Sequence, residues 1–258
     1  MHVTRKFGAV VLGSAVVAVG TLGVQAMLAR HRAGPITRPG FRIDETVNGE
    51  ADGPTLRVAI IGDSTVEGVG VLHERDTLAV HVARRAASLL ERPVHIRGFG
   101  ITGARAADVL ADQVPQLDDG GTYDQVLVAV GANDATHLTT SGSYESRLRR
   151  ILEGVRRAQP DAEIVIVSVP GFAAARAVPR PLRDVFESRA AALRGRQREL
   201  LRELGDERLH YADVYTDPTP RMVANPESIS RDGFHPSRIG YGYWADEIGP
   251  VMAAAARR

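Results

Sequence analysis

The sequence predicts an α/β fold in which a sheet of about five parallel strands is covered by helices on both faces. Short aliphatic runs alternate five times with longer segments whose apolar residues recur at helical spacing. The first run, LRVAII at 56–61, carries a single charge and is typical of a strand that is buried on both faces of a parallel sheet. Repeated strand-then-helix units of this length indicate right-handed crossovers between parallel strands.

The individual elements follow from the same patterns. We expect strands at residues 56–61, 93–96, 125–130, 163–169 and 209–214. We expect the main helices at residues 76–90, 104–117, 144–158, 182–204 and 238–256. Asp76 and Thr77 are suited to cap the first of these helices, because short oxygen-bearing side chains accept bonds from free N–H groups.

The N-terminal part of the chain differs in composition from the rest. Residues 7–28 form a run of 22 positions without a charge, and about 20 apolar residues suffice to cross a bilayer. We therefore expect residues 1–32 to be an anchor in the cell membrane, with the remaining domain outside the cytoplasm. A cleavable signal segment, cut near Val24-Gln25-Ala26, is the alternative and would give a secreted protein. Residues 33–54, rich in Pro and Gly, are predicted to be a linker before a single folded domain at 55–258.

Composition excludes several classes of function. The formal net charge of the 258 residues is +1 and aromatic residues make up 5%, which argues against a nucleic-acid partner. The absence of cysteine excludes disulfides, thiolate metal sites and cysteine nucleophiles. No group of His and Asp residues has the spacing of metal ligands, so we expect neither a metal nor another cofactor. We expect a monomer.

Gly62-Asp63-Ser64 follows the first predicted strand directly. Ligands of open α/β sheets bind at the carboxyl ends of the strands, so Ser64 is a candidate nucleophile. Asp63 is expected to support the loop, because a second carboxylate aimed at Ser64 would oppose developing negative charge. An ordinary βα turn with a capping serine is the alternative interpretation.

Two further strand ends carry groups that could meet Ser64. The second strand leads into GFGITG at 98–103, a pattern that also occurs in dinucleotide-binding loops, although here it does not follow the first strand. A simpler use of this loop is an accessible backbone N–H at Gly103. The third strand ends in Gly131-Ala132-Asn133-Asp134, where the Asn133 side-chain amide could point to the same place or close an Asx turn.

His235 is the histidine best placed to act as a base. It follows Asp232 by three residues in a glycine-containing loop, so the carboxylate can turn back onto the imidazole. The other histidines outside the first 32 residues lack this setting and are interpreted as structural, with His137 left as a possible substrate contact; they are His73, His81, His95, His137 and His210.

Taken in order, Gly62-Asp63-Ser64, Gly103, Gly131-x-Asn133-Asp134 and Asp232-x-x-His235 resemble the four motif blocks of the SGNH hydrolases, also called GDSL lipases and esterases. The resemblance covers about four-fifths of the chain. It implies a flavodoxin-like, three-layer α/β/α sandwich. The glycine block reads FGITGAR and lacks the Asn often found just upstream in relatives, which affects the bonding within this loop.

The resemblance also implies a serine esterase or lipase that forms an acyl-enzyme. Ser64 would be the nucleophile, His235 the base and Asp232 its partner, while Ser64 N–H, Gly103 N–H and Asn133 would form the oxyanion hole. The substrate would be a small-molecule, lipid or glycan ester. Alternatives are an acyltransferase that acts on envelope glycan or lipid, and a binding module with a degenerate site.

The shape of the acyl pocket is less constrained by the sequence. The loops expected to line it are residues 65–74, 135–144 and 171–181, which are rich in Gly, Ala, Thr and Pro and predict no chain length. The aromatic residues of the last helix, Tyr241, Tyr243 and Trp244, are predicted to belong to the core.

Overall fold

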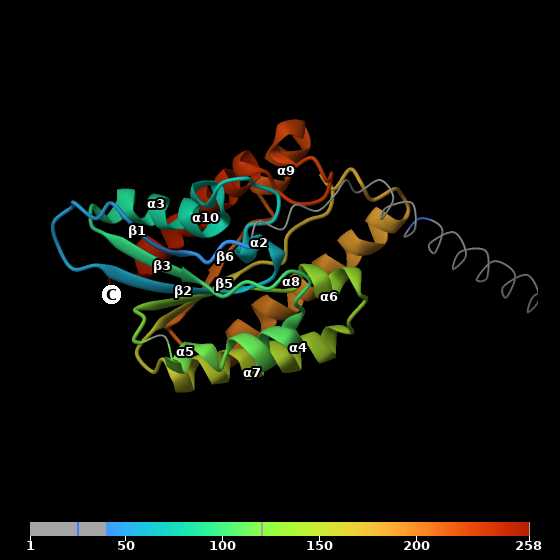
Figure 1. Ribbon diagram of the computed structural model, residues 1–258. Helices are drawn as coiled ribbons and strands as arrows, with labels where there is room; N and C mark the ends of the chain where they lie inside the picture. Colours follow the sequence, from blue (N-terminus) through green and yellow to red (C-terminus); the bar gives the residue numbers. More distant parts are fainter. Residues whose placement is uncertain (1–24, 26–39, 120, 258) are drawn as a thin grey trace, which may run out of the picture.

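The computed structural model describes residue 25 and residues 40–119 and 121–257. Its centre is a six-stranded sheet in the order β1-β3-β2-β4-β5-β6 (Figure 1). The five parallel strands are β2 (Leu56–Gly62), β3 (Val94–Gly98), β4 (Gln125–Ala129), β5 (Glu163–Val167) and β6 (Leu209–Ala212). This confirms the predicted α/β fold and its parallel sheet.

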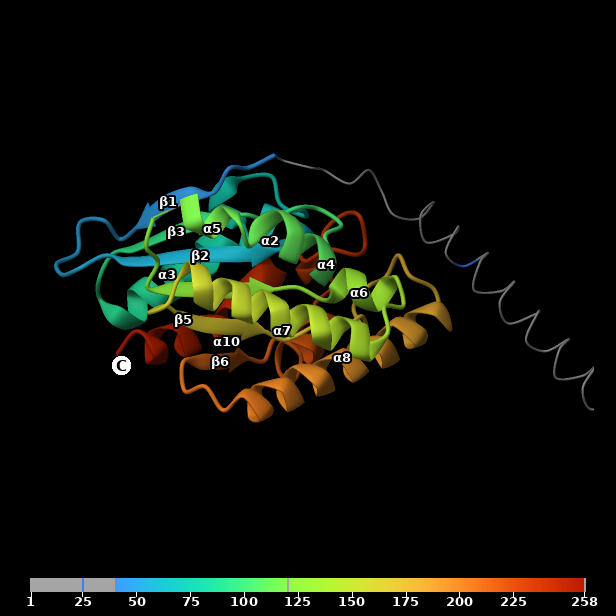
Figure 2. The same cartoon turned by 90° about the horizontal axis from the view of Figure 1, so that it is seen from below.

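Helices cover both faces of the sheet and make three layers (Figure 1). One face carries α3 (Leu78–Leu90) and α10 (Arg238–Ala255). Figure 2 looks onto the other face, which carries α4 (Ala106–Asp108), the π-helical turn η2 (Val109–Gln113), α5 (Gln116–Asp119), α7 (Ser141–Ala158) and α8 (Leu182–Leu204). The remaining short helices are α2 (Ser64–Glu67), η1 (Glu74–Asp76), α6 (Ala132–Thr136), α9 (Pro218–Ala224) and η3 (Pro226–Ser228).

The sheet separates the apolar interior into two cores, and the side chains of β2 contribute to both. Val58 and Ile60 pack with α3 and α10, whereas Ala59 and Ile61 pack with α7 and α8 on the opposite face. Successive side chains of a strand point to opposite faces, and here both faces are covered. This explains why the run at 56–61 is continuously apolar.

The predicted linker at residues 33–54 contributes a strand. Asp44–Val47 form β1, which pairs antiparallel with β3 from Asp44 opposite Arg97 to Val47 opposite Val94. The strand has only four residues and is half exposed, so it shows no apolar run in the sequence. Its order comes from backbone bonds to β3, and the ordered domain therefore begins before residue 55.

The prediction of one continuous helix at 104–117 was wrong. Residues 106–119 form α4, the wider turn η2 and α5, with the break at Val114 and Pro115. Proline has no N–H to donate and disrupts a helix that would continue through it. Within η2 the Val114 N–H bonds to Val109 O, and Gln113 is fully buried.

The topology explains where a site can form. From β2 the chain crosses to β3 on one side and returns to β4 on the other, so β2 and β4 are neighbours whose following segments leave in different directions. Open α/β sheets bind ligands in the crevice at such a point. Gly62, opposite Ala129 of β4, directly precedes Asp63 and Ser64.

The predicted anchor at residues 1–32 lies outside the described residues except for Gln25. The Gln25 side chain donates to Arg180 O at 2.8 Å and accepts from Leu182 N at 2.9 Å, at the start of α8. Across residues 40–119 and 121–257, none of the helices combines the length and apolarity that crossing a membrane requires.

Candidate active site

Ser64 is the first residue of α2 and lies at the end of β2. Asp63 caps this one-turn helix, because its Oδ1 accepts from the Thr65 N–H at 3.0 Å and from the Thr65 hydroxyl at 2.9 Å. Burial raises the pKa of Asp63, and the two bonds from Thr65 oppose this effect. The predicted role of Asp63 in supporting the loop is confirmed, and the serine itself is not the cap.

Ser64, His235 and Asp232 form a continuous chain of hydrogen bonds. Ser64 Oγ lies 3.0 Å from His235 Nε2, and His235 Nδ1 lies 2.6 Å from Asp232 Oδ2. With the Nδ1 proton donated to the carboxylate, Nε2 is left to accept the hydroxyl proton. All three residues are buried, although residues 64 and 235 are far apart in the sequence.

The Asp232 carboxylate is held in place by its second oxygen. Asp232 Oδ1 accepts from Ser230 Oγ at 2.6 Å, from Phe234 N at 2.8 Å and from His235 N at 2.9 Å. Burial alone raises the pKa of Asp232, but the bonds and charge of His235, together with the bonds from Ser230 and Phe234, hold that pKa well below its usual value. The carboxylate therefore stays ionised beside the imidazole. No motif in the sequence indicated this role for Ser230.

The three candidate oxyanion donors are linked through one loop. Glu67, at the end of the helix that Ser64 begins, accepts from the Thr102 N–H at 2.6 Å. Asn133 Nδ2 donates to Ala104 O at 3.1 Å, from the other side of the same loop. Between these bonds lies Gly103, with φ of +85°, a conformation that favours glycine. These bonds thus connect the segments that carry Ser64, Gly103 and Asn133, which follow the carboxyl ends of β2, β3 and β4.

The same bonds argue against a dinucleotide in the loop at 98–103. Phosphate-binding loops offer free backbone N–H groups and lead into a helix, whereas here the Thr102 N–H is taken by a carboxylate and the next helix, α4, has three residues. Gly100 serves a packing role instead, because a Cβ at this position would lie 2.3 Å from Glu67 N. The glycine spacing reflects close approach of the loop to α2.

Gln113 is a part of the site that the sequence analysis missed. Its Oε1 accepts from Gly62 N and its Nε2 donates to Gly62 O, each at 2.7 Å. The bonds satisfy both backbone groups of the residue two positions before Ser64 in a fully buried place. They depend on the π-helical turn, which no periodicity in the sequence indicates.

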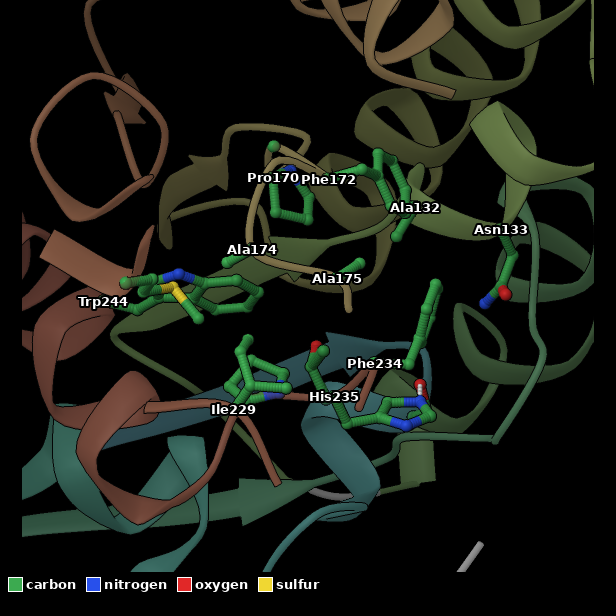
Figure 3. A pocket seen from close by; sticks show the side chains of 15 residues that line it. Ala132, Asn133, Pro170, Phe172, Ala174, Ala175, Ile229, Phe234, His235 and Trp244 are labelled. Carbon is green, nitrogen blue, oxygen red and sulfur yellow. Dashed lines mark hydrogen bonds between the residues drawn. The ribbon is translucent and has the colours of Figure 1, made fainter. Parts of the chain in front are cut away.

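A small cavity opens beside Ser64. Four of the fifteen lining residues are polar, namely Ser64, Thr65, Asn133 and His235. The other eleven are apolar: Ala132, Pro170, Gly171, Phe172, Ala174, Ala175, Met222, Ile229, Phe234, Pro236 and Trp244. Figure 3 shows Asn133 and Trp244 at opposite ends of this cavity.

The expected pocket loops were only partly right. Thr65 and all of residues 171–175 except Ala173 line the cavity, but no residue of 135–144 does, and the chain after β6 supplies Met222 and Ile229. Trp244 is 5% exposed, so it belongs to the core as predicted and also forms cavity wall. His137 does not line this cavity, and its Nδ1 lies 2.8 Å from Asn133 O.

The sequence matches the GDSL-like lipase/acylhydrolase family over residues 60–243, which includes every residue of the hydrogen-bonded chain. The chain belongs to this family. A GDSL-like esterase of Mycobacterium tuberculosis is 28% identical over 193 residues, covering 74% of this chain. The match spans 60% of the length of that relative.

Solved structures share this fold. A family 3 carbohydrate esterase of Clostridium thermocellum has a TM-score of 0.60 and 16% identity, over 79% of this chain and 98% of that chain. A carbohydrate acetylesterase family member of Sinorhizobium meliloti also has a TM-score of 0.60, with 18% identity over 79% of this chain and 100% of that chain. Both likenesses confirm the architecture.

Proposed function

We propose that this GDSL-family protein is a serine esterase that cleaves carboxylic esters through an acyl-enzyme. The observation that carries the proposal is the bonded order Ser64 Oγ, His235 Nε2, His235 Nδ1 and Asp232 Oδ2. A serine hydroxyl is a weak nucleophile until an adjacent base removes its proton, and a third group must fix the base. These are the positions that the three side chains occupy.

The reaction follows from these contacts. Ser64 Oγ attacks the ester carbonyl carbon while its proton passes to His235 Nε2, and the imidazolium is stabilised by Asp232. The negative charge on the carbonyl oxygen is held by the N–H groups of Ser64 and Gly103 and by the second N–H of Asn133. His235 then protonates the leaving alcohol. A water molecule next attacks the acyl carbon and gives its proton to the same nitrogen, and His235 returns that proton to Ser64 Oγ as the acid leaves.

Two other functions use the same fold. An acyltransferase would pass the acyl group to a sugar or lipid hydroxyl in place of water, and product analysis separates it from a hydrolase. A degenerate binding module would need no proton relay, yet Ser64, His235 and Asp232 retain one. The proton relay therefore favours an enzyme over a binding module, and hydrolysis is the reaction that we propose.

The test is hydrolysis of p-nitrophenyl acetate and butyrate by the purified chain. We expect turnover that Ser64→Ala or His235→Ala removes. Ser88→Ala, an exposed serine of α3, is the matched control and should keep full activity. Turnover that survives Ser64→Ala would contradict the proposal.

We also propose that residues 1–32 tether the enzyme to the membrane with its domain outside the cytoplasm. The support is the uncharged run at 7–28 and its length. Lipid or glycan esters of the envelope would then be within reach. Fractionation of cells that express the full chain tests this: recovery in the membrane pellet after alkaline washing is expected, and recovery in the cytoplasmic fraction would contradict it.

A further inference from the structure

The cavity beside Ser64 is a short apolar slot with one wall that is firmly packed. At the end away from Asn133, the slot is bounded by Trp244 of α10 (Figure 3). Met222 of α9 also lines the slot. The Trp244 ring packs edge-on against the ring of Tyr241, with centroids 6.0 Å apart, and the Tyr241 hydroxyl bonds to Val69 O. The contact with Tyr241 therefore restricts the movement of the Trp244 indole.

The lining of the slot suits an alkyl chain. Of its four polar residues, Ser64, His235 and Asn133 belong to the proposed chemistry. The hydroxyl of the fourth, Thr65, is already bonded to Asp63. Beyond the reacting groups the slot therefore offers a ligand apolar contact and no free charge, which favours the hydrocarbon part of an ester.

The volume of the slot limits the length of that chain. It encloses about 50 Å³. An engineered apolar cavity of about 150 Å³ holds one benzene molecule, so a third of that space accommodates roughly two or three carbon atoms, which is the alkyl part of a propionyl or butyryl group.

A second space of about 10 Å³ lies behind the first and shares Thr65, Ala132, Pro170 and Trp244 with it. Its remaining walls include Val167, the last residue of β5, and Ser168, which follows it. Trp244 thus borders both spaces. Removing its ring would join them and lengthen the slot.

We infer that the acyl chain of the substrate occupies this slot, that chains longer than butyryl fit poorly, and that Trp244 and Met222 set this limit. The inference rests on the proposed esterase function and deepens it. With the acyl chain in the slot, the enzyme would select its substrates by the acid more than by the alcohol.

The chain contains a single tryptophan, Trp244, so its fluorescence reports on the end of the slot. Ethyl p-nitrophenyl phosphonates that carry a methyl, butyl or octyl chain serve as probes. Ser64 Oγ forms a bond to phosphorus and p-nitrophenolate leaves, which measures the extent of labelling. After the released phenolate is removed, we expect the butyl adduct to change the emission, the methyl adduct to leave it unchanged, and the octyl probe to react slowest.

Matched variants test which residues set the limit. In Met222→Ala, the ratio of kcat/KM for p-nitrophenyl hexanoate over acetate should rise roughly tenfold, the value of one or two methylenes in an apolar pocket. Met252→Ala removes a buried methionine of α10 outside the slot and should leave the ratio unchanged. Trp244→Leu should shift the preference towards still longer chains.

A variant that reduces the volume of the slot shows whether a changed preference could come from loss of folded protein. Ala175→Leu should lower the butyrate-to-acetate ratio, and any ratio of two substrates is independent of the amount of active enzyme. Equal rates from acetate to octanoate, or no emission change after full labelling with the butyl probe, would overturn the inference while leaving the esterase proposal intact. Failure to hydrolyse any ester would overturn both.

Discussion

Asn133 Nδ2 donates to Ala104 O at 3.1 Å and thereby links the segment after β4 to the loop after β3. This bond uses one of the two amide protons of Asn133 and fixes the direction of the other. The side chain can therefore hold the proposed oxyanion without reorganising during the reaction.

For Asn133→Ala we accordingly expect kcat to fall roughly 10²–10³-fold, the usual cost of losing one oxyanion donor. KM should change little, because the bond strengthens when charge develops. Steady-state kinetics with p-nitrophenyl acetate give both values. Asn225→Ala, whose amide bonds to Tyr243 outside the cavity, is the control and should keep its kcat. Unchanged turnover in Asn133→Ala would remove Asn133 from the site.

Gln113→Leu should lower both stability and kcat. The variant removes the side-chain partner of the buried Gly62 N–H and one of the two partners of the Gly62 carbonyl, which also accepts from Ile101 N, and this costs roughly 1–3 kcal/mol in the free energy of unfolding. Because Gly62 precedes Asp63 and Ser64, its displacement should move the nucleophile as well. Urea denaturation and kinetics measure the two effects.

Gln125→Leu provides the comparison for Gln113. Gln125 is also fully buried, and its amide donates to Met252 O at 2.8 Å, at the other end of the sheet. We expect this variant to lose stability but to keep kcat. Equal kcat in the two variants would show that Gln113 supports the fold without positioning Ser64.

Gly100→Ala should disturb the loop that carries Gly103. The added Cβ would lie 2.3 Å from Glu67 N and 2.7 Å from Val66 C, and backbone atoms cannot move aside as a side-chain tip can. Overpacking of this kind costs roughly 1–3 kcal/mol. In Gly142→Ala the Cβ meets nothing within 4 Å in α7, so stability should rise by about 0.4–1 kcal/mol. Melting curves of both variants measure these changes in stability. A Gly100→Ala protein as stable as the wild type would contradict the close approach of the loop to α2.

The pKa of Asp232 predicts how stability changes in acid. Folding lowers this pKa below the ordinary value of 3.8, so the ionised carboxylate stabilises the fold above pH 3.8 and its contribution is lost as pH falls below that value. The difference in unfolding free energy between the wild type and Asp232→Asn should therefore be constant from pH 7 to about 5 and shrink towards pH 3. A difference that grew in acid would contradict the bonded arrangement.

The sequence predicted the buried elements well because their signals are local. Helix α8 occupies Leu182–Leu204 as predicted, and its end is marked by Gly205, which adopts the left-handed conformation with φ of +56°. Strand β1 was missed because it depends on pairing with β3, and the break at 114–115 was missed because η2 follows no standard period. Such features arise from tertiary contacts that a single segment does not encode.

The same distinction between local and tertiary signals applies to the residues of the site. Ser64, Asp232 and His235 could be named from short motifs, and the structure brings them together. Ser230 and Gln113 carry no motif, because an ordinary serine or glutamine gains its role only from the neighbour it meets. Trp244 was assigned to the core, and the pattern of α10 could not show that one side of its ring also borders a cavity.

The acyl-enzyme itself is the most direct test of the central claim. Turnover of p-nitrophenyl acetate is stopped with acid within the first cycles, and the digested protein is mapped by mass spectrometry. The proposed mechanism predicts an acetyl group on the peptide that contains Ser64, and its absence from Ser64→Ala. An acetyl group on another residue, or hydrolysis without any covalent adduct at Ser64, would contradict the mechanism.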